Sequence, residues 1–369
     1  MANEVKAGRR KGTAVTIHEV ARRAGVSPMT VSRVMNGKNN VHESTRAAVL
    51  RVVRDLNYTP NPAARSLAGA QGTRVALIYA NPSASYLSEL LVGALDGAHR
   101  KGVQLVLDRW GDLKPAGERA AARKLAKGIS GVILPPPLCE SKTISAEFVS
   151  AKIPVVAIAA GHFRGDISCV RIDDFHASKE MTEHLLRAGH TRIGFIKGHP
   201  NQTASERRFA GFQAAMDEAG IAIDSALIQQ GYFTYRSGLE AAEMLLSKKR
   251  VPTAIFASND DMAGAVVSVA HRKGFDVPRD LSVVGFDDTP TATTVWPELT
   301  TIRQPIAAMA EVALDLLLRD IRRRKDGHEA LAIDHVVAHE LVVRDSVAPP
   351  RVEPRSAMQS RMTHDRTST

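Results

Sequence analysis

Residues 16–35 read TIHEVARRAGVSPMTVSRVM and carry the signals of two short helices joined by a tight turn. Thr16 and Glu19 have the spacing of a capping box, in which each side chain accepts a hydrogen bond from the other residue's backbone amide. Gly25 supplies the left-handed conformation that a turn between helices needs. The pair Ser27-Pro28 is typical of a helix start, because serine caps the first amides and proline fits the first helical position. The stretch therefore predicts a helix-turn-helix.

A third helix is predicted over Glu43–Leu56, with four apolar residues facing the first two helices: Val49, Leu50, Val53 and Leu56. The second helix is too polar to serve only as core. Its side chains offer the hydrogen-bonding and apolar groups that can enter a DNA major groove: Met29, Thr30, Ser32, Arg33 and Asn36. The structural alternative is a small three-helix bundle with a solvated basic face.

The positive charge of the chain is concentrated around these helices. Of 49 Lys and Arg and 39 Asp and Glu residues, 12 and 4 fall in residues 1–70, so +8 of the net +10 lies there. A compact basic module is typical of a protein that binds a polyanion. Nucleic acid is the first interpretation. An acidic membrane surface is the alternative, but it would require an amphipathic Trp/Phe face, which these residues lack.

The rest of the composition excludes several classes of protein. The sequence has no run of about 18 apolar residues, so no membrane-spanning helix is predicted. Residues 1–13 are basic, but the apolar stretch of an export signal does not follow them. We therefore expect the protein in the cytoplasm. Cys139 and Cys169 lie far apart in the sequence, and neither is part of a CxxC or CxxH motif. Neither a structural zinc site nor a disulfide framework is therefore expected. The sequence contains no HExxH or GxSxG motif, and we expect neither an enzyme nor a cofactor.

From Thr73 onward, short apolar strands alternate with longer helical segments, which indicates parallel α/β architecture. The predicted strands are 74–79, 103–107, 131–134, 155–158, 193–196, 254–256 and 282–286, and the predicted helices include 87–100, 179–187, 207–219, 238–246 and 262–272. This is too many strands for one five-stranded unit, so we expect two doubly wound lobes, the second beginning near Asp174. A ligand crevice is expected between the lobes, beyond the carboxyl ends of the strands. No glycine-rich phosphate loop follows the first strand.

Polar and aromatic residues follow several of these strands. Ser258–Asp261 and Gly285–Asp288 each follow an apolar strand, Gly231–Tyr235 ends another, and Gly198–Thr203 leads to Arg207 and Arg208 at a helix start. A guanidinium, an amide and a carboxylate near aromatic rings suit a sugar, which offers hydroxyls and an apolar ring face. Asn and Asp at strand ends are equally common as helix caps, and that alternative stays open.

The chain resembles the lactose/galactose-repressor family in the segments Thr16–Ala21, Ala24–Ser27, Thr30–Val34 and Leu56–Asn61, and then through Ala64–Ala68 to near Arg344. The resemblance implies a three-helix head, a hinge helix, and two doubly wound α/β lobes of periplasmic-binding-protein type. It implies domains at 16–60 for the head, 61–72 for the hinge helix and linker, and 73–345 for effector binding and dimerisation. A basic flexible tail over 1–15 and a disordered tail over 346–369 complete the expected organisation.

The resemblance also implies roles for single residues. Base edges would be read by Pro28, Met29 and Arg33, with Asn36 and Asn40 nearby. Phosphates would be touched by Thr16, Ser27, Thr30, Ser32 and Tyr58. In the hinge, Asn61 and Ala64 would contact DNA, and Leu67 would wedge between base pairs in the minor groove. The effector would be bound by Arg208, Phe233, Asn259 and Asp287.

The sequence departs from the family pattern at His42, where a small capping residue is common, and at Pro135–Pro137 and Ala159-Ala160, where polar ligand contacts are common. The implied partners are a palindromic double-stranded DNA operator, a sugar effector and a second copy of the chain. Two further classes stay open. A periplasmic sugar-binding protein would share the lobes but need an export signal and no DNA head, and a constitutive nucleoid-associated protein would not respond to a ligand.

Overall fold

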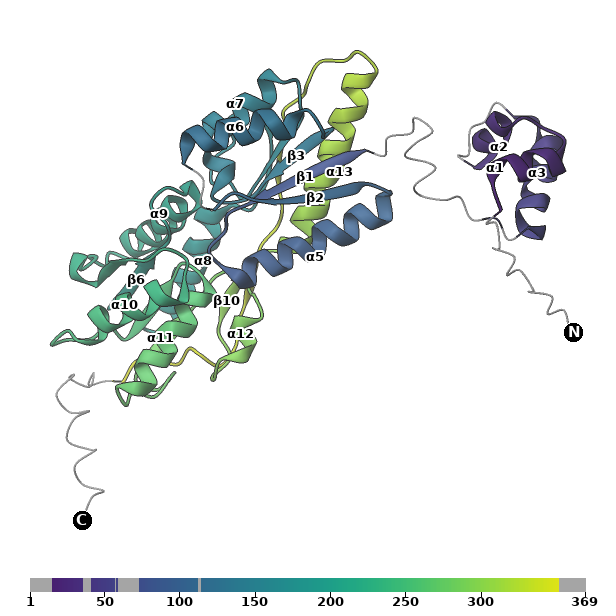
Figure 1. Ribbon diagram of the computed structural model, residues 1–369. Coiled ribbons are helices and arrows are strands. Elements are labelled where there is room, and N and C mark those ends of the chain that lie inside the picture. Colours follow the sequence, from purple (N-terminus) through teal and green to yellow (C-terminus); the bar gives the residue numbers. More distant parts are fainter. Residues whose placement is uncertain (1–14, 36–40, 57, 59–72, 112–113, 352–369) are drawn as a thin grey trace, which may run out of the picture. The chain divides into compact units, whose positions relative to one another are not determined.

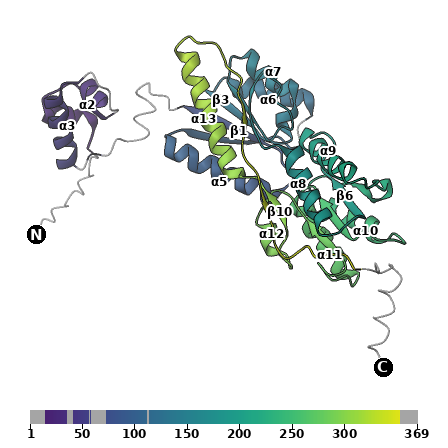
Figure 2. The same ribbon diagram turned by 180° about the vertical axis from the view of Figure 1, so that it is seen from behind.

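The computed structural model describes residues 15–35, 41–56, 58, 73–111 and 114–351. The chain divides into two compact units, Met1–Gly72 and Thr73–Thr369 (Figures 1 and 2). Five predicted DNA contacts lie outside the described residues, namely Asn36, Asn40, Asn61, Ala64 and Leu67, and so does the predicted hinge helix over 61–72. No helix in the described ranges is long and apolar enough to cross a membrane.

The first unit contains the three predicted helices: α1 (Ile17–Ala24), α2 (Pro28–Met35) and α3 (Glu43–Asp55). Gly25 ends α1 with φ +66°, the left-handed conformation that the turn requires. The centre of the unit is a small apolar cluster made by Val20, Ala21, Val31, Val34 and Val49. The helix-turn-helix prediction is therefore confirmed.

Two details of that prediction are wrong. The Thr16 side chain makes no capping hydrogen bond, and the Glu19 carboxylate lies 3.5 Å from the Arg22 guanidinium instead of turning back to Thr16. Leu50 is 40% exposed, whereas Val52 packs against the cluster. Successive residues of an α-helix are rotated by about 100° about its axis. Leu50 therefore points away from the core that Val49 faces, and Val52, three residues after Val49, faces the core again.

The second unit begins with lobe 1, which is built on a six-stranded parallel sheet in the order β11-β5-β4-β3-β1-β2. Its strands are β1 (Arg74–Tyr79), β2 (Gln104–Arg109), β3 (Gly131–Leu134), β4 (Val155–Ile158), β5 (Ser168–Arg171) and β11 (Asp334–Val336). Its helices are α5 (Ala84–Lys101), α6 (Pro115–Ala126), η1 (Leu138–Glu140), α7 (Lys142–Ser150) and α13 (Ile306–Lys325).

Lobe 2 is built on a four-stranded parallel sheet in the order β7-β6-β8-β9. The strands are β6 (Ile193–Lys197), β7 (Ile228–Gln230), β8 (Ala254–Ala257) and β9 (Ser282–Val284). The helices are α8 (Asp174–Arg187), α9 (Thr203–Glu218), η2 (Ser225–Leu227), α10 (Tyr235–Leu246), α11 (Asp260–Arg272) and α12 (Thr291–Thr294). Lobe 2 begins at α8, as predicted from Asp174.

The chain then returns to lobe 1, which the sequence did not indicate. Helix α13 lies along α5 (Figure 1), and a Cβ at Gly93 would overlap the backbone of Ala307, so the two helices approach closely because Gly93 has no side chain. Between the lobes, β10 (Thr301–Arg303) pairs antiparallel with β12 (Glu340–Val342). Lobe 1 is thus made of two separate parts of the chain.

The predicted boundary at residue 345 is wrong. Ser346 is buried, its hydroxyl donates to the Val283 carbonyl, and its carbonyl accepts from the Val283 amide. The Ala348 amide donates to the Ser282 hydroxyl, and Arg351 forms an ion pair with Asp280. Residues 346–351 therefore belong to lobe 2, because their backbone groups complete the hydrogen bonding at the edge of its sheet.

Candidate DNA-binding surface and ligand pocket

Helix α2 presents polar and apolar side chains on the face opposite its buried valines. Met29 is 62% exposed and Arg33 is also exposed, one helical turn further on. The Ser27 hydroxyl caps the helix by accepting from the Thr30 amide at 3.2 Å, and it lies 2.9 Å from the Thr30 hydroxyl. The first turn of α2 is thereby fixed, and its outer face is open to a DNA groove.

The remaining described residues of the predicted DNA surface lie around this helix. Pro28 and Ser32 are half-buried on α2, Thr16 is exposed in front of α1, and Tyr58 is half-buried against the apolar cluster after α3. His42 precedes α3 and makes no side-chain cap, in agreement with the departure noted in the sequence. The structure thus places these residues together on one small unit.

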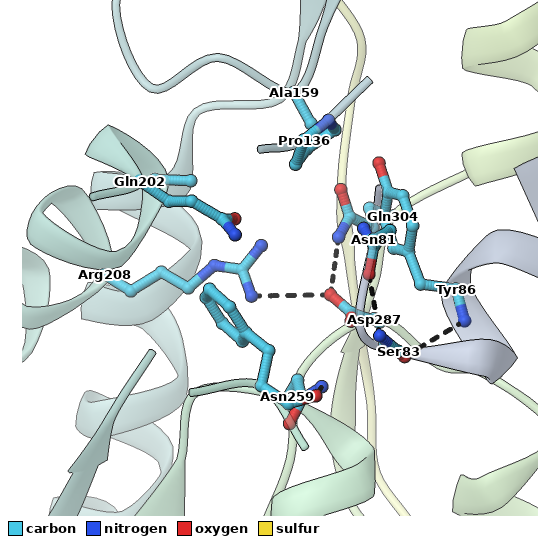
Figure 3. Close-up of a pocket in the computed structure, with 12 residues that line it drawn as sticks. Asn81, Ser83, Tyr86, Pro136, Ala159, Gln202, Arg208, Asn259, Asp287 and Gln304 are labelled. Atoms are coloured by element: carbon cyan, nitrogen blue, oxygen red, sulfur yellow. Dashed lines mark hydrogen bonds and ion pairs between the residues drawn. The ribbon is translucent and has the colours of Figure 1, made fainter. Parts of the chain in front are cut away.

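A pocket lies between the lobes at the carboxyl ends of the strands, where the α/β topology predicts a ligand site (Figure 3). The space between its lining residues is narrow and opens to solvent on one side. Lobe 1 contributes Asn81, Ser83, Tyr86, Pro136 and Ala159, and the remaining lining residues are Gln202, Ala204, Arg208, Phe233, Asn259, Asp287 and Gln304. All four predicted effector contacts therefore line one pocket.

Arg208 is the centre of a buried polar network on the pocket floor. Its Nε donates to Asp174 Oδ1 at 2.8 Å and its Nη1 to the Ser258 carbonyl at 2.6 Å, while Asp287 Oδ1 lies 3.4 Å from Nη1. The guanidinium also stacks 3.6 Å from the centre of the Phe286 ring. Burial raises the pKa of Asp174, and the positive charge of Arg208 opposes that shift. The guanidinium is thus held rigidly between two carboxylates.

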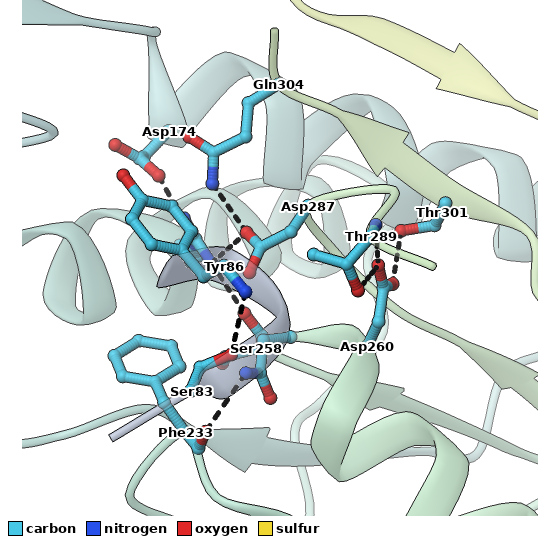
Figure 4. Close-up of polar contacts among 12 residues, drawn as sticks. Ser83, Tyr86, Asp174, Phe233, Ser258, Asp260, Asp287, Thr289, Thr301 and Gln304 are labelled. Atoms are coloured by element: carbon cyan, nitrogen blue, oxygen red, sulfur yellow. Dashed lines mark hydrogen bonds and ion pairs between the residues drawn. The ribbon is translucent and has the colours of Figure 1, made fainter. Parts of the chain in front are cut away.

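Asp287 is fixed by an unusual backbone conformation and by an amide. Its φ is +108°, outside the range that most residues adopt, and Gln304 Nε2 donates to its Oδ1 at 2.5 Å (Figure 4). Below it, the buried Asp260 accepts from the Thr289 amide at 2.8 Å and from the Thr301 hydroxyl at 2.7 Å. These bonds hold the segment that carries Asp287 against the start of α11.

The stability of the protein should depend on pH through Asp287. Burial raises the pKa of Asp287 from 3.8 to about 7, although Arg208 lowers it. The native state then holds more protons than the unfolded chain between about pH 4 and 7, so its stability falls as pH rises through that window. We expect the free energy of unfolding of the wild-type protein to fall relative to that of D287N by at most about 1.4 kcal/mol per pH unit. Denaturant titrations of both proteins across this window measure the difference, and parallel pH profiles would contradict it.

Phe233 and Asn259 form another wall of the pocket. Phe233 has φ +59°, and a Cβ at Gly198 would overlap its ring, so the ring occupies space that only glycine leaves open. Asn259 Oδ1 accepts from the Met262 amide at 3.0 Å, and its Nδ2 donates to the Phe233 carbonyl at 3.2 Å. Asn259 therefore caps α11 and also lines the pocket. Its position is compatible with both predicted roles, helix cap and effector contact.

Sequence reasoning missed Tyr86 and Gln304. The Tyr86 hydroxyl and Gln304 Oε1 are buried and have no hydrogen-bond partner among the described residues. Burial raises the pKa of the Tyr86 hydroxyl, which keeps it protonated as a donor. Pro136 and Ala159 line the pocket where the sequence departs from the family pattern. Lobe 1 thus contributes apolar surface through Pro136 and Ala159, and the lining groups without a hydrogen-bond partner among the described residues are the Tyr86 hydroxyl and Gln304 Oε1.

Hydrogen bonds across the cleft join the lobes on two sides of the pocket. Glu140 of lobe 1 accepts from the amide and the hydroxyl of Thr203, the first residue of α9, at 3.0 and 2.7 Å. The Gly161 amide donates to the same hydroxyl at 2.8 Å. A carboxylate at a helix N-terminus is favoured by the helix dipole, so this contact is well suited to hold the cleft closed.

The second set of cross-cleft bonds is centred on Asp261 in the first turn of α11. Its carboxylate accepts from the Ser83 and Ser85 hydroxyls of lobe 1 at 2.7 and 3.1 Å, and from the Thr291 hydroxyl at 3.0 Å. The lobes are closed on each other through these side chains. Any ligand that moves the lobes must change these contacts.

The described residues contain no candidate metal site, and their two cysteines are buried. No group of three or more His, Cys, Asp or Glu side chains among them could hold a metal ion. Cys139 and Cys169 are buried and unpaired, and burial raises the pKa of both thiols. His190, after α8, interacts with the Thr253 hydroxyl and the Ala348 carbonyl, which is a structural role.

A helix-turn-helix unit followed by a two-lobed domain with a polar pocket defines the class of ligand-responsive DNA-binding transcription regulators. Residues 16–61 match the bacterial regulatory proteins of the lacI family, and residues 182–347 match the periplasmic binding protein-like domain. The chain is 36% identical over 337 residues to the HTH-type transcriptional regulator DegA of Bacillus subtilis (strain 168), covering 90% of this chain and 98% of that protein. The chain therefore belongs to the lacI family.

Further similarities cover almost the whole chain. It is 33% identical to Catabolite control protein A of Priestia megaterium, covering 87% of this chain and 97% of that protein. The fold matches a lac repressor structure bound to ONPG in the repressed state, with TM-score 0.73, 27% identity, and 91% and 100% of the two chains covered. It also matches a complex of the transcriptional regulator CelR with cellobiose, with TM-score 0.67, 30% identity, and 90% and 99% covered.

Proposed function

We propose that this regulator represses transcription by binding a palindromic operator as a homodimer, and that a small-molecule effector of the sugar class controls its operator affinity. The observation that carries the proposal is the buried Arg208 between two carboxylates in an interlobe pocket, on the same chain as a helix-turn-helix. A DNA-binding role places its action in the cytoplasm, and the buried polar groups of the pocket serve binding instead of catalysis.

The DNA contacts follow from the exposed face of α2. Pro28, Met29 and Arg33 read base edges in the major groove, with Asn36 and Asn40 nearby. Thr16, Ser27, Thr30, Ser32 and Tyr58 touch phosphates, which fix the register of the helix on the duplex. For residues 61–72, which lie outside the described ranges, we propose that Asn61 and Ala64 contact DNA and that Leu67 inserts into the minor groove.

Arg33→Ala tests the base-reading role of α2. Arg33 is exposed, so its loss leaves the core of the head intact. We expect discrimination at one base position to relax by about 1–3 kcal/mol. Competition binding with single-base operator variants measures it. Arg22→Ala is the control, because Arg22 is 79% exposed on α1 and forms only a 3.5 Å contact with Glu19. Equal discrimination by R33A and wild-type protein would contradict the assignment.

The effector side rests on the chemistry of the pocket. The Asp287 carboxylate accepts from hydroxyls, the Tyr86 hydroxyl and Arg208 donate, and the Phe233 ring offers an apolar face. The solved CelR complex holds cellobiose and a lac repressor structure holds ONPG, so related pockets accept carbohydrate ligands. A melting-shift screen of sugars and nucleobases, with and without operator DNA, tests this part. A response to nucleobases alone would contradict the sugar class.

Dimerisation is supported by apolar side chains that are exposed on lobe 1 and beside α12. Val92 and Leu95 on α5 are 54% and 50% exposed, and Trp296 after α12 is 77% exposed. Figures 1 and 2 both show α5 and α12 on one flank of the two-lobed domain. Large exposed apolar side chains are typical of interfaces. A twofold dimer would present two heads, which matches a palindrome.

The pocket is connected directly to the segments that cross between the lobes, which supports control by the effector. Asp287 lines the pocket, and the next residue, Asp288, forms ion pairs of 2.7 Å with Arg303 on β10 and with Arg344. A ligand that moves Asp287 would thus also move Asp288 and, through its ion pairs, Arg303 on β10 and Arg344. A coupling free energy of about 1–3 kcal/mol between ligand and operator is typical of such control.

A further inference from the structure

The C-terminal end of α13 carries a dense group of basic residues that neither the helix-turn-helix nor the pocket uses. Arg322, Arg323, Arg324 and Lys325 form its last turn. Further basic residues lie at the same end of lobe 1, on α6, at the start of β1 and before β4. Together we call these eight residues the basic end: Arg74, Lys124, Lys127, Lys152, Arg322, Arg323, Arg324 and Lys325.

Contacts within lobe 1 bring these residues together. A Cβ at Gly128 would lie 3.5 Å from Arg74 Nη1, and Arg324 Nη1 donates to the Lys152 carbonyl at 3.3 Å. In the parallel sheet, Val75 of β1 is in register with Gly131 of β3. The basic end therefore surrounds the N-terminal ends of the strands, opposite the pocket. Figure 1 shows the start of β1 and the C-terminal end of α13 away from lobe 2.

The charge of the second unit is segregated toward this end. From residue 71 onward the chain holds 37 basic and 35 acidic residues. The basic end accounts for 8 of these basic residues, and the acidic residues on the same stretch of α13 and its following turn are Asp320, Asp326 and Glu329. Asp334, the first residue of β11, also lies at these strand ends, and it forms an ion pair with Arg171. A nearly neutral domain thus has a local excess of basic residues at this end.

Helix ends alone explain only part of this charge. Basic residues in a last helical turn are favoured by the helix dipole, and Arg324 is neutralised by Asp320 at 3.1 Å. Lys127, Arg322 and Lys325 are exposed, however, and none of them forms an ion pair with a carboxylate in the described ranges. Their charge is therefore available to a partner outside the domain.

We propose that the basic end of lobe 1 contacts the phosphate backbone of the DNA that the helix-turn-helix holds. The inference rests on the proposed operator binding. The chain enters lobe 1 at Arg74, within the basic end, and only 14 residues separate Tyr58 of the head from Thr73. Of all parts of lobe 1, this end is thus tethered most directly to the DNA-binding unit. Phosphates are the partner that matches its charge, and contact with them adds affinity without sequence preference.

The test is the salt dependence of operator binding by the full-length protein. The probe is a palindromic duplex selected from a random library by the wild-type protein. In the variant K127Q/R322Q/K325Q we expect weaker binding at low salt. The slope of log affinity against log salt should become shallower by about 0.9 for each phosphate that the variant no longer neutralises. The matched control is K248Q/K249Q/R250Q, which removes three charges at the equivalent strand ends of lobe 2.

The outcomes separate direct phosphate binding from an effect of net charge. A shallower slope for the lobe 1 variant alone supports the proposal. In that case R322E should weaken operator binding at low salt more than R322Q does. A wild-type slope for the lobe 1 variant overturns it, and so does an equal change in both triple variants, which would report long-range charge only. If wild-type protein binds selected and scrambled duplexes equally, the proposed function itself fails. Melting temperatures of all variants establish that they are folded.

Discussion

Replacing Arg208 with alanine is expected to abolish the response to effector and to destabilise the second unit by about 3–5 kcal/mol, since it leaves buried carboxylates unpaired. Asp174 and Asp287 lie 2.8 and 3.4 Å from the guanidinium, and both are buried. The loss of Arg208 removes the charge that opposes their desolvation. Chemical denaturation of wild-type and R208A protein measures the change in the free energy of unfolding.

The neighbouring Arg207 provides a matched control. Its guanidinium is 3.7 Å from Asp173, its side chain is 33% exposed, and it stacks on the Phe175 ring. R207A should lose less than about 1 kcal/mol, because partly exposed ion pairs contribute little. D287N tests ligand recognition with one buried hydrogen bond retained, since the asparagine still accepts from Gln304. It should lose the effector response in titrations of preformed operator complexes, and an unchanged midpoint would contradict the site assignment.

Removing residues 1–72 should leave a folded, ligand-binding domain that has lost sequence-specific DNA binding. The two units are separate in the fold, and most of the net charge lies before residue 71. Specific recognition typically exceeds nonspecific binding by about 4–10 kcal/mol, and we expect that whole difference to disappear. Fluorescence anisotropy with selected and scrambled duplexes measures it.

The truncated domain also has an internal control. Its effector affinity and melting temperature should match those of the same domain in the intact protein, because the pocket residues all lie after residue 80. Operator preference retained by the truncated domain would contradict the assignment of base reading to α2. A truncated domain that fails to fold would contradict the independence of the two units.

Much of this architecture was predictable because buried parallel strands are short apolar runs. The predicted strands 74–79, 131–134 and 155–158 coincide with β1, β3 and β4. Strand β5, SCVR, was missed because its residues are mostly not large and apolar, although Ser168, Cys169 and Val170 are all buried. The return of α13 to lobe 1 depends on its packing against α5, which no local pattern encodes.

The pocket residues that come directly after a strand could be predicted from the sequence. Asn259 and Asp287 follow β8 and β9, and Arg208 lies in the second turn of α9. Tyr86 and Gln304 were missed because their approach to the pocket depends on how the lobes close. The capping box failed for a different reason: an exposed Glu19 can pair with Arg22 as easily as with a backbone amide.

The intact protein is expected to distinguish an operator by its sequence. The most direct measurement is competition between a selected palindromic duplex and a scrambled duplex of equal length, at physiological salt, with full-length protein. We expect the palindrome to bind at least about 1,000-fold more tightly, the lower end of the range for specific regulators. Equal affinity for the two duplexes would rule out sequence-specific regulation and would indicate a protein that coats DNA without regard to sequence.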